Sequence, residues 1–239
     1  MLKKLLTISE ASSFLSLSRD TLRRLDKTGA IKAKRSDNVK HRRYDLEDLE
    51  NYLILKSIDY AKAWLKSKHP ILPKDIFYCR DSSIFQGKLY KLNNDLKSLS
   101  IKTDIPLLTA SVGEIGDNSF GHNIGNWPDI SGLFFVYNLE NRFIVLADRG
   151  RGILNTLRKI RPNLKNDEEA LKIAFTEIVS GRAPESRGNG LKFVKANVEK
   201  FKWSLYFQSK SGEIQIESKK FLIKKAKEPI SGCLAILRF

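Results

Sequence analysis

The sequence predicts an α+β protein with two domains. A small winged helix-turn-helix domain is followed by a larger domain in which helices pack on a mixed, largely antiparallel sheet. Three observations predict this. Two short capped helical segments open the chain, helical and strand-like segments follow from residue 76, and the length of 239 residues suits one large or two small domains. We place the first domain at residues 1–56, a helical linker at 57–75 and the second domain at 76–239.

The first domain begins with two short helices joined by a tight turn. Ser9 can cap the first helix, and Ser18 can cap a second helix over residues 19–27, which Gly29 ends. Leu22 of the second helix is expected to face inward. Two short helices with such a turn form a helix-turn-helix.

A hairpin and a third helix complete this domain. Residues 31–35 and 41–44 predict two short strands joined by a polar turn, which form a wing. Asp45 is placed to cap a third helix that runs from Leu46 to about Lys66. This helix would close the first domain and lead into the linker.

The second domain alternates between helical and strand patterns. Residues 76–79 read as a strand and residues 88–99 as a helix. The later elements are expected to be a helix (106–122), two strands (133–137 and 143–147), two helices, a glycine loop, a helix (192–200) and three strands (203–207, 213–218 and 233–239).

Composition excludes several classes of protein. With 41% hydrophobic residues the chain can bury a core, and no apolar run or amino-terminal leader pattern indicates a membrane span or secretion. Cys79 and Cys233 are too few for a disulfide framework and fit core thiols of a cytoplasmic protein. The net charge of +16 favours a polyanionic partner.

The second helix and the wing carry side chains suited to DNA. In a helix-turn-helix the second helix enters the major groove, and arginine pairs with guanine edges or phosphates through two parallel hydrogen bonds. The candidate DNA-binding residues are Arg19, Thr21, Arg23, Arg24, Arg42, Arg43 and Tyr44. The alternative is that these charges form a solvated or protein-binding face.

Residues 7–53 resemble the MerR-like and excisionase-like winged helix-turn-helix family. The motifs that carry this resemblance are Ile8-Ser9-Glu10-Ala11, Ser18-Arg19-Asp20-Thr21-Leu22-Arg23-Arg24, Gly29-Ala30-Ile31 and His41-Arg42-Arg43-Tyr44. The resemblance implies DNA binding, with the Arg-Arg-Tyr element on the phosphate backbone. Because the long coiled coil of the activator branch is replaced by the short stretch 46–66, a homodimer stays an open alternative.

Three polar clusters in the second domain predict a phosphate-bearing ligand. Glu114 and Asn118 lie one turn apart on a helix, where a carboxylate beside an amide can position water and Mg²⁺. Asp148 follows an apolar strand and can accept a hydrogen bond from an exocyclic amine. Gly150 and Gly152 would let a flat base approach the backbone. Singly, these clusters are also typical of a polar helix face or a glycine turn.

The third cluster is Ser186-Arg187-Gly188-Asn189-Gly190-Leu191, which opens the helix expected over 192–200. Its glycines expose backbone N–H groups at a helix N-terminus, where the helix dipole favours an anion. The preceding segment 180–187, punctuated by glycine and proline, is suited to a lid that orders over a ligand.

In this order, the three clusters resemble those of the Bergerat-fold (GHKL) ATPases, the superfamily of gyrase, the heat-shock 90 chaperone, sensor histidine kinases and MutL, over about residues 76–239. The resemblance implies a Bergerat-type α/β sandwich that binds ATP and Mg²⁺. By this resemblance Glu114 would be the general base, Asn118 would coordinate Mg²⁺ and Asp148 would bind the adenine amine. Gly150 and Gly152 would flank the base. The phosphates or another part of the cofactor would be contacted by Arg187, Gly188, Asn189 and Gly190. For Arg187, as for Arg182, a solvated arginine is an equal alternative.

Together the two resemblances predict an ATP-binding, ATP-hydrolysing DNA-binding protein, a nucleotide-gated regulator such as one of transcription. One alternative is a histidine-kinase-like or anti-sigma-type kinase acting on a separate partner protein, and another is a nucleotide-gated module without turnover. His41, His69 and His122 lack the helical context of a phosphoacceptor, which disfavours a self-contained histidine kinase.

Overall fold

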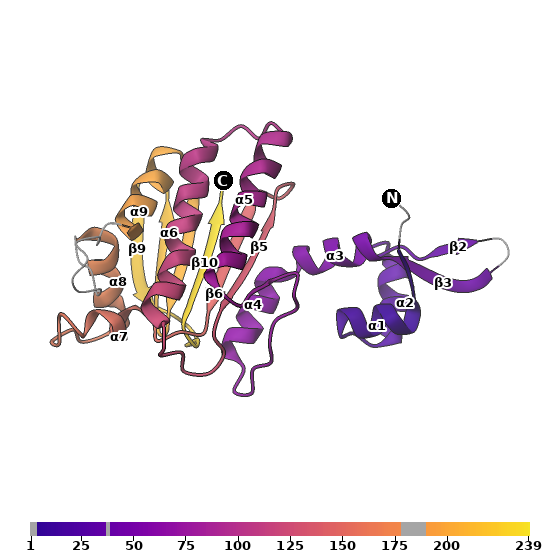
Figure 1. The fold of residues 1–239 in the computed structure, drawn as a ribbon, viewed down its shortest axis with the longest axis horizontal. Coiled ribbons are helices and arrows are strands. Elements are labelled where there is room, and N and C mark those ends of the chain that lie inside the picture. Colours follow the sequence, from indigo (N-terminus) through magenta and orange to yellow (C-terminus); the bar gives the residue numbers. More distant parts are fainter. Residues whose placement is uncertain (1–3, 37–38, 178–189) are drawn as a thin grey trace. The chain divides into compact units, whose positions relative to one another are not determined.

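The chain divides into two compact units, Met1–Ser57 and Ile58–Phe239, each with its own sheet (Figure 1). The structure is a computed structural model that describes residues 4–36, 39–177 and 190–239. The α+β class predicted from the sequence is confirmed. Within the described ranges, no helix has both the length and the apolar character that a bilayer crossing requires.

In its described residues, the first unit has three helices and a three-stranded antiparallel sheet in the order β1-β3-β2. Its elements are β1 (Leu5–Thr7), α1 (Ile8–Leu15), α2 (Arg19–Thr28), β2 (Lys34–Ser36), β3 (Val39–Asp45) and α3 (Leu46–Leu55). The two helices and the hairpin are confirmed. Strand β1 was not predicted, because its three residues are too few to show a strand pattern.

Caps fix the ends of the helix pair. Thr7, and not Ser9, caps α1: its side chain accepts from Glu10 N–H, and the Glu10 carboxylate accepts from Thr7 N–H at 2.7 Å. This reciprocal pair satisfies two free backbone donors, so it outcompetes Ser9, which lies inside the helix. Ser18 caps α2 as predicted, and Gly29 ends it with a φ of 79°.

The expectation of one helix from Leu46 to about Lys66 is wrong. Asp45 caps α3 through Glu47 N–H at 3.1 Å, but α3 ends at Leu55 and a separate helix, α4 (Ser57–Lys66), follows after Lys56. The two helices serve different cores. Leu49 and Leu53 of α3 are buried in the first unit, whereas the buried Ala61 and Leu65 belong to α4 in the second. The stretch expected to be one helix is therefore two helices, whose apolar residues are buried in two different units.

The second unit is built on a seven-stranded sheet in the order β4-β5-β6-β10-β7-β8-β9, in which every neighbouring pair is antiparallel. Its strands are β4 (Tyr78–Cys79), β5 (Leu133–Asn138), β6 (Phe143–Asp148), β7 (Ser204–Ser209), β8 (Gly212–Glu217), β9 (Lys220–Lys225) and β10 (Cys233–Arg238). After α4, its helices are α5 (Ser82–Ser98), α6 (Ile105–Asn123), α7 (Ile153–Leu157), α8 (Asp167–Thr176) and α9 (Gly190–Lys200). Strand β9 was not predicted, and α5 begins six residues before the predicted start.

Helices cover one face of this sheet, and α4 packs against part of the other. Figure 1 shows α5, α6 and α9 side by side on one face, and their buried side chains form one core with the strands. The alternate residues of the strands face the other way. There Phe134 packs against Trp64 of α4, with ring centroids 6.3 Å apart. Thus α4, which lies in the expected linker, is part of the second unit.

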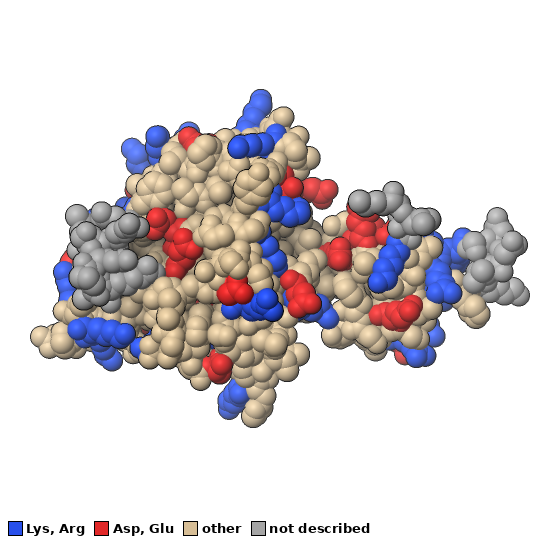
Figure 2. All heavy atoms as spheres, in the orientation of Figure 1, with Lys and Arg blue, Asp and Glu red and all other residues tan. Residues whose placement is uncertain are grey.

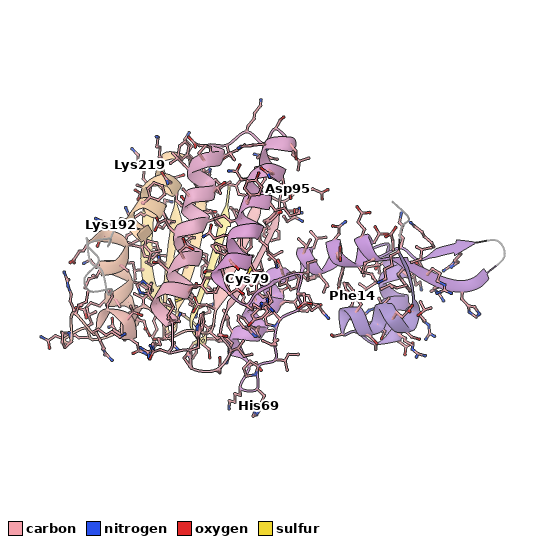
Figure 3. The ribbon with its side chains drawn as sticks, in the orientation of Figure 1. Phe14, His69, Cys79, Asp95, Lys192 and Lys219 are labelled. Carbon is pink, nitrogen blue, oxygen red and sulfur yellow. The ribbon has the colours of Figure 1, made fainter. Side chains whose placement is uncertain are left out.

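The two free cysteines fit the expected core thiols. Cys79, labelled in Figure 3, is fully buried, and Cys233 is partly buried. Burial raises the pKa of the Cys79 thiol to about 11, although the charge of Lys88 acts in the opposite direction. The thiol is therefore protonated and unreactive at neutral pH.

A close crossing between α5 and α6 fixes the position of α6. A Cβ atom added at Gly116 would overlap the ring of the fully buried Phe85. One turn earlier, a Cβ at Gly113 would lie 3.3 Å from Leu89 Cδ2, at the end of a flexible side chain. Of these two glycines, Gly116 is the one whose lack of a side chain is a strict steric requirement.

We therefore predict that Gly116→Ala destabilises the protein by about 1–3 kcal/mol, because an overpacked core must shift its ring and backbone. Gly113→Ala is the matched control and should have a much smaller effect, because the higher helix propensity of alanine offsets a mild contact. Urea unfolding of both variants measures the difference. Equal destabilisation by the two substitutions would contradict the steric account.

Candidate functional site

Three arginines of α2 are exposed, as the DNA-binding prediction requires. Arg19, Arg23 and Arg24 are all solvent-exposed, and Arg23 forms an ion pair with Asp20 at 2.5 Å. The Thr21 hydroxyl lies 2.9 Å from that of the cap residue Ser18, so Thr21 supports the start of the helix as well. On the face shown in Figure 2, basic and acidic side chains are interspersed and the net charge does not gather into one patch.

Asp26 of α2 joins the second helix to the wing. Its carboxylate accepts hydrogen bonds from Ala33 N–H at 3.0 Å and from Arg42 Nε at 2.9 Å, and it pairs with Arg35 at 3.2 Å. Partial burial acts to raise the pKa of Asp26, but these donors outweigh it and the pKa is lowered. Sequence reasoning missed this residue because its partners are far along the chain.

The Arg-Arg-Tyr element divides between the two faces of β3. Arg43 is half-buried, whereas Tyr44 is fully buried, because successive side chains of a strand point to opposite faces. The Tyr44 hydroxyl has no hydrogen-bond partner within the described part of the chain. The expected DNA contact from Tyr44 is therefore corrected: its ring belongs to the core of the first unit.

In the second unit, α6 brings the first and third predicted clusters together. Glu114 is exposed and Asn118 half-buried on α6. A Cβ atom added at Gly190, the first residue of α9, would overlap Glu114 Oε2 and lie 3.6 Å from Asn118 Nδ2. The first turn of α9 thus lies directly against this carboxylate and amide. Arg187, Gly188 and Asn189 lie outside the described residues.

The same helix contacts the second cluster. Asp148, at the end of β6, is only 4% exposed. Its carboxylate accepts hydrogen bonds from Ser119 Oγ and from Gly150 N–H, both at 2.8 Å. Burial raises the pKa of Asp148, while these hydrogen bonds, the Lys210 charge and Cys233 N–H act in the opposite direction. Ser119 is one residue after Asn118 and was missed.

The glycines of this cluster are required by close packing. A Cβ atom at Gly150 would overlap the side chain of Asn123, whose Oδ1 accepts from Arg151 N–H at 2.9 Å. Gly152 has a φ of 77°, and a Cβ there would lie 2.8 Å from Lys210 Cγ. Asn123 at the end of α6 therefore orders the loop, a role that sequence reasoning missed.

A protein-only metal site is not present in the described part of the chain, where no group of three or more His, Cys, Asp or Glu side chains could hold a metal ion. Magnesium in nucleotide sites is typically held by one or two side-chain oxygens together with phosphates and water. Glu114 and Asn118 carry side-chain oxygens of this kind and lie close to Gly190. The donor set therefore fits Mg²⁺ that arrives with phosphates.

A family model described as a helix-turn-helix domain matches residues 5–54. This match spans α1, α2, the wing and nearly all of α3. No curated protein matches the chain. The first unit therefore contains a helix-turn-helix domain, a class of domain that supports DNA binding.

We predict that Arg19→Ala and Arg24→Ala each weaken DNA binding about 10-fold, since each removes a charged donor from the exposed face of α2. Fluorescence anisotropy with a duplex selected from a random pool measures the affinity. Lys97→Ala on α5 removes the same charge from an exposed site of the second unit and should change affinity less than 2-fold. Equal effects of all three changes would contradict a specific interface on α2.

Proposed function

We propose that the protein binds DNA through its first unit and Mg·ATP through its second, and that the nucleotide changes the affinity for DNA. The observation that carries this proposal is the position of α6, which carries the first predicted cluster, bonds to Asp148 of the second and lies against Gly190 of the third. Glu114 and Asn118 face Gly190, while Ser119 holds Asp148. Residues from three distant parts of the sequence thereby meet around one helix.

The environment of Asp148 supports recognition of adenine. A carboxylate offers about four acceptor positions, and Ser119 Oγ, Gly150 N–H and Cys233 N–H supply three donors. The remaining position would accept the exocyclic amine of adenine. Because a buried carboxylate is strongly favoured by each added donor, this contact would discriminate against a base that presents an acceptor there.

The polar face of α6 supports binding and hydrolysis of the triphosphate. Asn118 would supply an oxygen to Mg²⁺, which would neutralise phosphate charge, and the N-terminus of α9 at Gly190 would donate backbone N–H groups. Glu114 is exposed beside this N-terminus, so its Oε2 would accept a proton from a water molecule that attacks the terminal phosphate. This arrangement suits an ATPase.

We predict that Asn118→Ala weakens Mg·ATP binding at least 10-fold, because it removes the proposed magnesium ligand. DNA binding without nucleotide should be unchanged, because Asn118 belongs to the second unit and not to the helix-turn-helix unit. Isothermal titration of the full chain measures the first affinity and anisotropy the second. Asn94→Ala on the exposed face of α5 is the matched control and should bind Mg·ATP normally. Wild-type affinity in Asn118→Ala would overturn the assignment of this site.

Glu114→Gln separates binding from hydrolysis. We expect phosphate release to fall about 100-fold or more with ATP affinity kept within about 3-fold, because the amide cannot accept the proton from water. Glu140→Gln, on an exposed turn between β5 and β6, is the control. Unchanged phosphate release would remove Glu114 from the reaction. Transfer of labelled phosphate to a second protein, in place of release, would favour the kinase alternative.

A further inference from the structure

The C-terminal end of α4 is hydrogen-bonded to residues at the end of the sheet that carries Asp148. Three backbone carbonyls at this end of α4 accept hydrogen bonds: Trp64 O from Arg149 Nη1 at 2.5 Å, Ser67 O from Arg149 Nη2 at 3.1 Å, and Leu65 O from Ser231 N–H at 2.9 Å. A cation at a helix C-terminus also interacts favourably with the helix dipole.

Arg149 is held in this position by further contacts. Its side chain is 3% exposed, and both Nε and Nη2 donate to the Asp129 carboxylate, at 3.0 and 2.7 Å. The guanidinium also lies over the Trp64 ring, 5.8 Å from its centroid. A buried charge with this many partners has few alternative positions, so movement of its backbone must move its partners as well.

Arg149 directly follows Asp148, and the two side chains leave opposite faces of the sheet. Asp148 meets Ser119 of α6 on one face, whereas Arg149 meets α4 on the other. Gly150 N–H donates to the Asp148 carboxylate, so the backbone on both sides of Arg149 depends on the position of Asp148. Two neighbouring residues therefore connect the candidate adenine site to α4.

We propose that Arg149 is a positioning residue that transmits occupancy of the nucleotide site to α4, and that α4 passes this change along the chain to the helix-turn-helix unit. Only Lys56 separates α4 from α3 in the sequence. The inference rests on the proposed function, and it adds the route by which the two sites are coupled. A nucleotide that favours one position of Asp148 thereby favours one position of α4.

The test compares Arg149→Lys with Arg151→Lys in the full chain. Lysine keeps the charge at position 149 but lacks the planar guanidinium, whose three separate nitrogens donate to Asp129 and to the two carbonyls. Arg151 belongs to the same loop, but its Nε donates to Asn126 O at 3.1 Å and not to α4, which makes it the matched control. The readout is the ratio of DNA dissociation constants with and without Mg·ATP.

In the wild type and in Arg151→Lys, we expect Mg·ATP to change the DNA dissociation constant by at least about 5-fold. In Arg149→Lys the change should be less than about 2-fold, while the affinity for Mg·ATP itself stays within about 3-fold of wild type. Because coupling is reciprocal, DNA must also lose its effect on ATP affinity in Arg149→Lys. A wild-type ratio in a folded Arg149→Lys protein would overturn the inference and leave the proposed function intact. Absence of Mg·ATP binding in the wild type would overturn both.

Asp129→Asn provides a second variant in case Arg149→Lys does not fold. It weakens the ion pair that holds the Arg149 guanidinium in place against α4, at a carboxylate whose side chain is 36% exposed. We expect it to lower the ratio partway, with thermal unfolding still cooperative. A ratio equal to that of the wild type would again overturn the role of Arg149.

Discussion

The alternation of side chains at the end of β6 is the constraint on which the second unit depends. Asp148 points to α6 and Arg149 to α4, so one dipeptide is bonded to a helix on each face of the sheet. The crossing of Gly116 with Phe85 then fixes where α6 lies, and Ser119 fixes how Asp148 is held. The candidate nucleotide site follows from these contacts.

The first unit is organised around a different carboxylate. Asp26 connects α2 to backbone and arginine donors of the wing, so the helix expected to enter the major groove and the hairpin beside it are linked. This linkage leaves Arg19 and Arg24 exposed, while Arg42 has a structural partner. The separation of α3 from α4 at Lys56 reflects two independent cores.

Much of the fold could be predicted from local patterns, and the misses have physical causes. Caps such as Ser18 and Gly29 are encoded within a few residues, so the helix pair was predictable. Asp26 and Arg149 were not, because their partners lie many residues away and only the folded chain brings them together. Tyr44 was misassigned because a motif does not state which face of a strand is buried.

The central claim is that one chain binds DNA and Mg·ATP and that each affects the other. The most direct measurement is equilibrium binding of a labelled duplex pool with and without Mg·ATP at two salt concentrations, since contacts to phosphates impose a steep dependence on salt. The account predicts that nucleotide shifts DNA affinity at both salt concentrations. DNA affinity that is the same with and without Mg·ATP at both concentrations would contradict it.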